Sequence, residues 1–353
     1  MRVRISGDAA RFLRGIRPKT LLHGIAQFVR KPGHESFPLE VLSAGIVIPD
    51  VDVEVEAVEE LKLSITATDG FVGRNAENAT TDNAPIIDAC VSFGGLKLFY
   101  SAVSNVGLVR ARNEDSCGLF IPPNAEVLKL LGVLAVLADG MGGHECGDRA
   151  SSLVMESVGK SYYESRQQDP GEALVSAVEA AHQAILADSA ITGRDMGSTC
   201  SVLLFRGNTA YAAHVGDSRI YRWRDGSLEQ FTADDSMVAE MVRRGMLTPA
   251  QAHRHPDRSV LLNALGQTET LTVSRASTPC ALQDGDEFLI CSDGLHGLVT
   301  DAEIAGLLGV ASSLAVANED LLELALQRGG GDNVSMVLMR VRCSGNPESV
   351  LNN

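Results

Sequence analysis

The stretch from Val133 to Ala150 reads Val-Leu-Ala-Val-Leu-Ala-Asp-Gly-Met-Gly-Gly-His-Glu-Cys-Gly-Asp-Arg-Ala. Six apolar residues lead directly into Asp139, and four glycines fall between Gly140 and Gly147. An uninterrupted apolar run is typical of a buried strand, and glycines let the backbone turn sharply after it. We therefore expect Asp139 to stand at the mouth of a hydrophobic core, where a carboxylate can take part in chemistry.

The composition is that of a globular protein with a sizeable core. Of the 353 residues, 45% are hydrophobic and 21% are charged. The net charge of −15 argues against nonspecific nucleic-acid binding, which needs a basic surface. The seven cysteines include no Cys-x-x-Cys pair, which argues against a disulfide framework and favours a cytoplasmic location. No apolar run reaches the roughly 18–20 residues of a transmembrane segment, and no signal specifies an oligomeric state.

The first 93 residues differ in character from the rest. Residues 1–33 are basic with interleaved apolar side chains, which fits two short amphipathic helices broken at Pro18. Such a segment either docks on the protein itself or contacts an anionic partner or a membrane surface. Residues 44–68 are acidic and strand-like, and residues 69–88 are polar and are predicted to form a linker. Residues 1–93 are therefore an N-terminal extension of unknown role.

The main domain is predicted to span residues 94–343, with a C-terminal tail over 344–353. Its patterns predict strands near 97–103, 133–138, 201–205, 209–215, 218–223, 287–291 and 334–341. They predict helices near 148–163, 170–190, 301–308 and 319–327. Strands that cluster in the second half, with helices between them, favour an α+β layered domain over alternating βαβ units.

Four acidic segments of this domain lie beside predicted strands or glycine turns: 110–115, 139–140, 289–294 and 329–333. Carboxylates repel one another if they converge, unless cations hold them, and they are the ligands that Mg²⁺ and Mn²⁺ prefer. Arg110 could grip phosphate oxygens beside such ions. A single Asp-Gly pair is usually no more than a turn, but four such segments together favour a metal site.

The order in which these segments follow one another along the chain is a more specific signal than any one of them. Arg-x-x-Asn-Glu-Asp, Ala-Asp-Gly-Met-Gly-Gly-His, Gly-Ser-Thr, Val-Gly-Asp-Ser-Arg, Ser-Asp-Gly-Leu and Gly-Gly-Asp-Asn-Val together resemble the PP2C (PPM) family of metal-dependent serine/threonine phosphatases in its bacterial form. The resemblance covers roughly residues 96–342. It implies an α/β/β/α sandwich of two antiparallel sheets flanked by helices, with a site for two Mn²⁺ or Mg²⁺ ions at one end.

The resemblance also implies a role for each matching residue. Asp139 bridges the two ions, Glu114 and the Gly140 carbonyl join it on one ion, and Asp293 and Asp332 complete the other. A metal-bound water then attacks phosphorus directly, so that no phosphoenzyme forms.

The resemblance implies roles for further positions as well. Asp115 stands in an outer position of the metal site, Arg110 binds the substrate phosphate, and His144 is the candidate for protonating the leaving alcohol. Asp217 corresponds to a ligand of a weaker third ion. Gly297 stands where the family has a further aspartate for that ion, which puts the third site in doubt.

The expected activity is therefore hydrolysis of phosphoserine and phosphothreonine in proteins that a serine/threonine kinase has phosphorylated. Two alternatives remain open: a catalytically weak PP2C-like regulatory or binding module, and an adaptor in which residues 1–93 carry the main role. Residues 232–262 resemble the mobile flap that shapes substrate choice in the family. The Cys-x₅-Arg spacing of Cys200 and Arg206 is that of thiol phosphatases, but the residues between them are strand-like, not turn-forming.

Overall fold

The computed structural model divides the chain into two compact units, Met1–Ser64 and Ile65–Asn353. It describes residues 84–343 apart from 143–145, 166, 268–269 and 276–278, together with a few short strands earlier in the chain.

Unit 1 is described only through four short strands: β1 (Val3–Arg4), β2 (Phe37–Val41), β3 (Ile46–Val51) and β4 (Glu54–Val55). β1 pairs with β4 and β2 pairs with β3, both antiparallel. β3 and β4 fall within the predicted strand-like stretch 44–68. Apart from β1, the predicted amphipathic helices of residues 1–33 lie outside the described residues.

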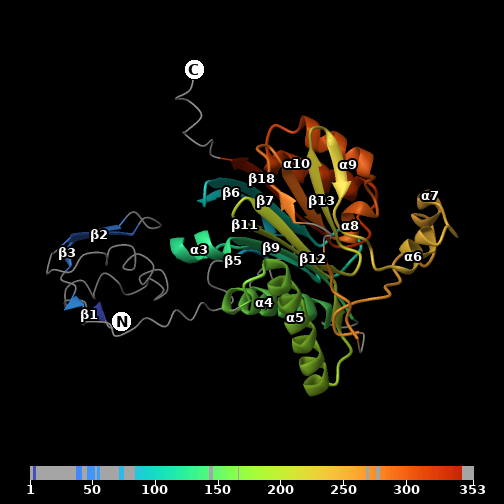
Figure 1. Ribbon diagram of the computed structural model, residues 1–353, viewed down its shortest axis with the longest axis horizontal. Helices are drawn as coiled ribbons and strands as arrows, with labels where there is room; N and C mark the ends of the chain where they lie inside the picture. The colour runs from blue at the N-terminus through green and yellow to red at the C-terminus, as the bar shows by residue number, and fades with distance from the viewer. Residues whose placement is uncertain are drawn as a thin grey trace. The chain divides into compact units, whose positions relative to one another are not determined.

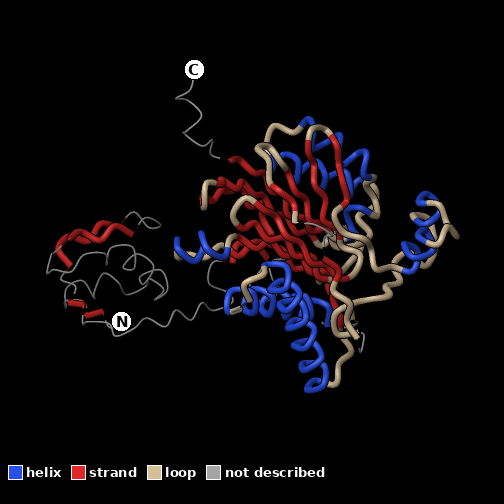
Figure 2. Tube along the Cα trace, viewed as in Figure 1, coloured by secondary structure: helices blue, strands red, loops and turns tan. Residues whose placement is uncertain are grey.

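Unit 2 contains two antiparallel sheets that face each other (Figures 1 and 2). The first sheet has the order β15-β12-β11-β9-β8-β5, with β10 on β9 and β16 on β12. Its strands are β5 (Phe71–Arg74), β8 (Asp115–Phe120), β9 (Val133–Met141), β10 (Gly197–Ser198), β11 (Cys200–Arg206), β12 (Thr209–Val215), β15 (Ser274–Arg275) and β16 (Cys280–Ala281). The second sheet has the order β14-β13-β17-β18-β7-β6. Its strands are β6 (Ala84–Phe93), β7 (Leu96–Asn105), β13 (Arg219–Arg224), β14 (Ser227–Gln230), β17 (Glu287–Cys291) and β18 (Val334–Cys343).

Helices cover the outer face of each sheet (Figure 1). The helices are α3 (Ala125–Leu131), α4 (Cys146–Glu164), α5 (Pro170–Thr192), α6 (Met237–Arg243), α7 (Pro249–Ala252), α8 (Asp293–His296), α9 (Asp301–Val310) and α10 (Leu314–Gln327). α4 and α5 pack on the first sheet, and α8, α9 and α10 pack on the second. The expected α/β/β/α sandwich is confirmed. Within the described residues, no helix combines the length and apolar character needed to cross a bilayer.

The position of β9 explains its uninterrupted apolar run. Alternate side chains of a strand point to opposite faces of the sheet. Leu134, Val136 and Ala138 pack in the core beneath α4 and α5, whereas Ala135 and Leu137 pack in the core between the two sheets. All of them are fully buried. A strand covered on both faces must be apolar at every position, which is what its sequence shows.

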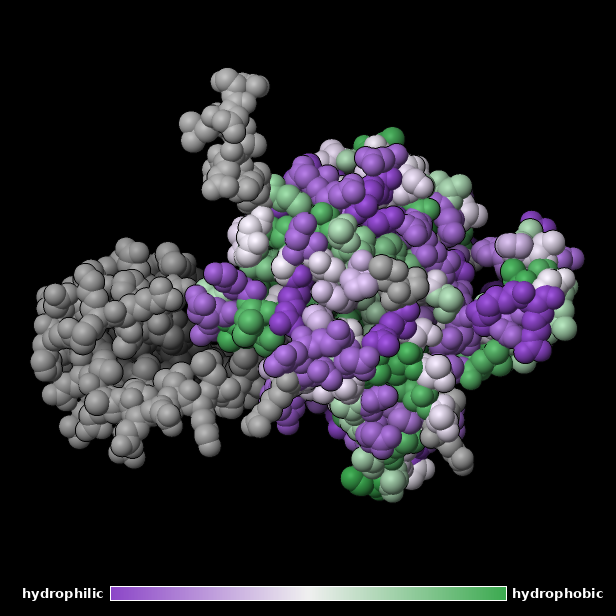
Figure 3. Space-filling model, in the orientation of Figure 1, coloured by the Kyte–Doolittle hydropathy of each residue, from purple (hydrophilic) through white to green (hydrophobic). Residues whose placement is uncertain are grey.

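The surface drawn in Figure 3 is largely hydrophilic, including the part over α6 and α7. Large apolar side chains are exposed at scattered places, either singly, as at Ile191 at the end of α5 and Met246 after α6, or as the neighbouring pair Leu108 and Val109. Isolated exposures of this kind are ordinary on a protein surface. The flap-like segment 232–262 contains both α6 and α7, and they stand to one side of the two sheets (Figure 1).

The sheets begin earlier in the chain than the sequence indicated. β5 and the first residues of β6 fall within 69–88, which the sequence predicted as a linker, and both precede the expected boundary near residue 94. β6 pairs along its length with β7, and β5 pairs with β8. Because β6 is an edge strand with exposed positions at Asp88 and Cys90, it lacks the continuous apolar pattern that would have revealed it.

We expect truncation to distinguish a domain that begins near Ile65 from one that begins near residue 94. A chain that begins at Ile65 keeps both sheets and should unfold at the temperature of the full chain. A chain that begins at residue 94 loses β5 and β6, together with the contacts that Ile87, Val91 and Phe93 make with the core between the sheets. Its free energy of unfolding should fall by about 2–4 kcal/mol. Equal stability of the two truncated chains in urea denaturation would contradict this assignment of the sheets.

Candidate active site

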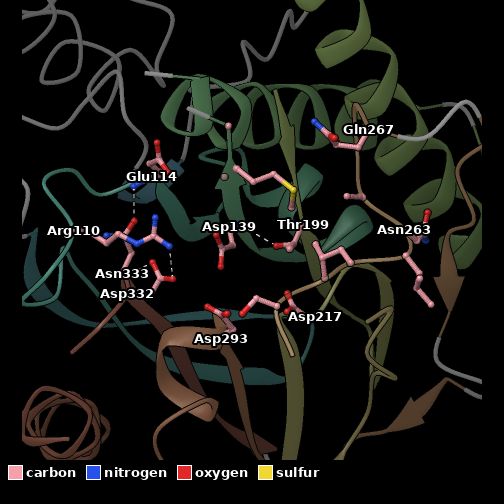
Figure 4. A pocket seen from close by; sticks show the side chains of 17 residues that line it. Arg110, Glu114, Asp139, Thr199, Asp217, Asn263, Gln267, Asp293, Asp332 and Asn333 are labelled. Carbon is pink, nitrogen blue, oxygen red and sulfur yellow. Dashed lines mark hydrogen bonds and ion pairs between the residues drawn. The ribbon is translucent and has the colours of Figure 1, made fainter. Parts of the chain in front are cut away.

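A pocket of about 680 Å³ opens where loops and strand ends of both sheets meet (Figure 4). Seven of the residues predicted from the sequence line it: Arg110, Glu114, Asp139, Gly140, Asp217, Asp293 and Asp332. These residues are up to 222 positions apart in the chain, as in the ion pair between Arg110 and Asp332. The fold therefore brings the four acidic segments to one place.

Asp139 is held near the end of β9 by its neighbours in the first sheet. Its register partner on β8 is Asp115, so two carboxylates stand side by side on adjacent strands. Thr199 clamps its backbone from the other side. The Asp139 amide donates to Thr199 Oγ1 at 3.0 Å, and the Thr199 amide donates to the Asp139 carbonyl at 2.9 Å. Thr199 Oγ1 also shares a hydrogen bond of 2.7 Å with Ser218 Oγ.

The second sheet contributes Asp293 and, through a turn, Asp217. Asp293 begins the short helix α8 directly after β17. His296 of α8 hydrogen bonds through Nε2 to the carbonyl of Asp217 at 3.0 Å, which ties the two segments together. Gly294 is required for close packing, because a Cβ there would lie 1.9 Å from the Asn333 carbonyl oxygen.

Arg110 and Asp332 stand at the more open side of the pocket. Arg110 Nη2 donates to Asp332 Oδ2 at 2.7 Å, and the two side chains are 51% and 36% exposed. A guanidinium that is half exposed and held by one oxygen still has donors directed toward solvent. This arrangement suits the capture of an incoming anion at the pocket rim.

Asn333 joins the Arg110–Asp115 loop to the start of β18. Its Oδ1 accepts from the Glu114 amide at 2.8 Å, and its Nδ2 donates to the carbonyls of Val106 and Arg112 at 2.9 Å each. One side chain thus fixes the backbone on both sides of Arg110. The sequence singled out the segment that contains Asn333, but it gave this side chain no role.

Burial and mutual repulsion make the carboxylates of the pocket costly to ionise. Burial raises the pKa of Asp139 well above its usual value, and the charges of Asp115 and Asp293 raise it further. Burial, followed by the charge of Asp332, raises the pKa of Asp293 to about 6. Burial and the charge of Asp293 raise the pKa of Asp217 as well. A site built this way favours positive charge among the carboxylates.

The donor set fits divalent cations. Asp115 is buried behind Asp139; Ser292 Oγ donates to its Oδ2 at 2.9 Å, whereas its Oδ1 accepts no hydrogen bond. Burial raises the pKa of Asp115 to about 7, although hydrogen bonds from Ser335 and Ser292 oppose the shift. Among the described residues, no three acidic, histidine or cysteine side chains already converge on one point, so the side chains of the pocket would have to move closer together to share an ion. Carbonyl groups and water must complete the shell, as is usual for Mg²⁺.

The backbone is closely packed around Gly140. A Cβ on Gly140 would lie 1.9 Å from the Gly147 carbonyl oxygen and 2.7 Å from that of Glu114. A Cβ on Gly147 would in turn lie 2.7 Å from the Glu114 carboxyl carbon. The glycines after Asp139 therefore let the turn pack against Glu114, beyond allowing the chain to reverse direction.

Two further positions that the resemblance singled out have different outcomes. His144 lies outside the described residues, so its role stays a prediction. Gly297 follows the last residue of α8 with φ −70° and brings no carboxylate to the pocket. On the far wall of the pocket, Ser259, Leu261 and Leu262 belong to the flap-like segment 232–262, whereas no role was predicted from the sequence for Asn263 and Gln267.

Comparison with known proteins agrees with this geometry. The pattern of the family "Protein phosphatase 2C" matches residues 110–323. The serine/threonine protein phosphatase PstP of Mycobacterium tuberculosis is 40% identical over 257 residues, which cover 70% of this chain and 45% of PstP. The protein phosphatase PhpP of Streptococcus pneumoniae is 31% identical over 245 residues, which cover 68% of this chain and 96% of PhpP. This chain thus spans less than half the length of the mycobacterial relative that it matches.

Solved structures lead to the same family. A crystal structure of M. tuberculosis PstP is 38% identical, with a TM-score of 0.61, and covers 69% of this chain and 99% of that chain. The catalytic domain of PstP in complex with two manganese ions is also 38% identical, with a TM-score of 0.59. It covers 70% of this chain and 99% of that chain. The chain belongs to the protein phosphatase 2C family.

We expect Asn333→Ala to loosen the loop that carries Arg110 and Glu114. The change removes three hydrogen bonds, so the free energy of unfolding should fall by about 2–4 kcal/mol. Urea denaturation measures this loss. The control is Gln168→Ala, at an exposed residue far from Asn333 in the sequence. It should change the free energy of unfolding by less than about 0.5 kcal/mol. Equal stability of the two variants would show that Asn333 does not tether the loop.

Proposed function

We propose that this chain is a metal-dependent protein phosphatase that hydrolyses phosphoserine and phosphothreonine. The observation that carries the proposal is the single pocket in which Arg110 faces a group of buried carboxylates. Membership of the protein phosphatase 2C family supports the same activity. A guanidinium beside acidic side chains suits a phosphate monoester, because the acids can hold cations and the guanidinium can bind the phosphate oxygens.

The residues of the chain then have distinct tasks. Arg110 releases part of its contact with Asp332 and directs its donors to the nonreacting phosphate oxygens. Asp139, Glu114 and the Gly140 carbonyl would hold one divalent ion, and Asp293 and Asp332, with Asp139 between, would hold the other. When bound, the ions offset the charge of the phosphoryl oxygens and lower the pKa of the attacking water.

The surrounding structure keeps these groups in place. Thr199 fixes the backbone of Asp139, and Ser292 fixes Asp115 behind it. The fixed backbone limits how far the carboxylates can move apart under their mutual repulsion, so that part of the cost of assembling the site is met during folding. His144 remains the candidate that protonates the leaving alcohol, and Asp217 the candidate ligand of a weaker third ion.

The physiological setting follows from the same activity. The substrates would be proteins phosphorylated by a serine/threonine kinase, and residues 1–93 would regulate or localise the phosphatase unit. We place the enzyme in the cytoplasm because the described part of the chain, which includes all seven cysteines, contains no disulfide. A catalytically weak binding module is the alternative, and the absence of an acid at Gly297 is the observation that favours it.

The activity can be tested with a phosphothreonine peptide in the presence of Mn²⁺. Phosphate release should stop when a chelator is added and return when excess Mn²⁺ is supplied. Asp139→Asn should lower kcat by at least about 10²-fold, because it removes the charge at the centre of the carboxylate group. Gln168→Ala should behave as wild type.

Two results would overturn parts of this assignment. Hydrolysis that persists in chelator, or in Asp139→Asn, would contradict a metal-dependent site. Peptide binding without phosphate release at saturating Mn²⁺ would favour the binding module.

A further inference from the structure

The pocket extends beyond the carboxylates to a wall of different chemistry. This second wall, which we call the neutral wall, consists of Met141, Ser259, Leu261, Leu262, Asn263 and Gln267. None of these side chains carries a charge. In Figure 4, Arg110 stands on one side of Asp139, and Asn263 and Gln267 stand on the other. A phosphate held near Arg110 would therefore leave the rest of a peptide substrate within reach of the neutral wall.

The neutral wall is bonded to the strand that carries Asp139. Ser198 of β10 pairs with Gly140 of β9 on one side. On its other side Ser198 exchanges two backbone hydrogen bonds with Leu265, of 3.1 and 2.9 Å. These hydrogen bonds fix the Gln267 backbone, two residues after Leu265, relative to β9.

A second contact fixes the turn immediately before Gln267. The Gly266 amide donates to His182 Nδ1 of α5 at 3.0 Å. Gly266 has φ +78°, and a Cβ there would lie 2.3 Å from Ile185 Cγ2, so only glycine fits this close approach. A side chain that begins from so constrained a turn is preorganised for binding.

The two amides of the neutral wall differ in their remaining hydrogen-bonding capacity. Asn263 Nδ2 uses both hydrogens, on Asp235 Oδ2 at 2.9 Å and on the Thr272 carbonyl at 2.7 Å. Gln267 Nε2 donates once, to Asp195 Oδ1 at 3.0 Å. One N–H and the Oε1 lone pairs of Gln267 remain for a ligand. Its side chain is exposed, whereas Asn263 is half-buried and serves the fold.

Gly197 provides the space that the Gln267 side chain occupies. A Cβ on Gly197 would lie 2.5 Å from Gln267 Cγ and 3.2 Å from Met141 Cγ. The glycine of the Gly-Ser-Thr motif thus has a packing role, which is to let this amide lie over β10 within the pocket.

We propose that Gln267 is a substrate-positioning residue, whose amide hydrogen bonds to the main chain of the peptide next to the phosphorylated residue. An amide offers one donor and one acceptor, which match the C=O and N–H of a peptide group whatever its side chain. Gln267 would then favour protein substrates over small phosphate esters without selecting a particular sequence. This inference rests on the proposed phosphatase activity and names how the same site recognises its substrates.

The test compares a phosphothreonine peptide with an aryl phosphate, which has no peptide group, on the full-length protein with Mn²⁺. Gln267→Met keeps the length and packing over Gly197 but removes the amide. KM for the peptide should rise about fivefold with kcat unchanged, as for the loss of one neutral hydrogen bond. KM and kcat for the aryl phosphate should not change. Gln283→Met, on an exposed glutamine outside the pocket, is the matched control and should leave both substrates unaffected.

Peptide binding gives a readout that does not depend on turnover. In the Asp139→Asn background, Gln267→Met should weaken the Kd for the phosphothreonine peptide by about fivefold, measured by fluorescence anisotropy. An unchanged peptide KM and Kd would overturn the role of Gln267 and leave the phosphatase activity standing. An equal loss on both substrates would overturn it too, because it would mark a structural role. A wild-type protein that cleaves neither substrate would contradict the proposed activity, whereas the Kd comparison would still decide the role of Gln267.

Discussion

The crowding of buried carboxylates around Asp139 is the constraint on which the rest of the structure depends. Asp115 and Asp217 are buried, and Asp139 and Asp293 are half-buried at the pocket. Each of their pKa values is raised first by burial and then by a neighbouring acid. Such a cluster lowers the stability of a protein that has no use for it. Its presence at a pocket beside Arg110 supports the proposed role of the site in holding positive charge and binding phosphate.

The fold offsets this repulsion by fixing backbone instead of side chains. β9 is buried on both faces, and Thr199 and Ser198 hold its end through hydrogen bonds. Asn333 holds the loop of Arg110 and Glu114 from the second sheet. The two sheets are thus connected through the site itself, and the neutral wall continues the same hydrogen-bonded framework through β10.

Much of the architecture could be predicted from the sequence, because its central strands are mostly apolar. The predicted strands 133–138, 209–215 and 287–291 correspond to β9, β12 and β17, and the predicted helices 148–163 and 170–190 correspond to α4 and α5. β5 and β6 were missed because edge strands need no continuous apolar run. β8 was missed because it begins on Asp115 and contains Gly118, which weaken its pattern.

In the candidate site, too, the residues within sequence motifs could be predicted, whereas those that act through long-range contacts could not. The order of the motifs predicted Arg110, Asp139 and Asp293, since acids beside strands and glycines form a readable signal. The contributions of Asn333 and Gln267 could not be predicted, because each acts on residues far away in the chain. Asn333 bonds to backbone 219 residues away, and Gln267 bonds to Asp195 across 72 residues. Only the folded structure shows that Asn263 uses both of its amide hydrogens in the fold, whereas Gln267 keeps one for a ligand.

The central claim is that the carboxylates converge on this pocket to hold divalent cations. Anomalous diffraction from crystals of the full chain grown with Mn²⁺ tests it most directly. Two anomalous peaks are expected in the pocket beside Asp139, and both should be lost in Asp139→Asn crystals that retain the fold. Crystals saturated with Mn²⁺ that show no peak in the pocket, or peaks only at acids elsewhere on the surface, would contradict it.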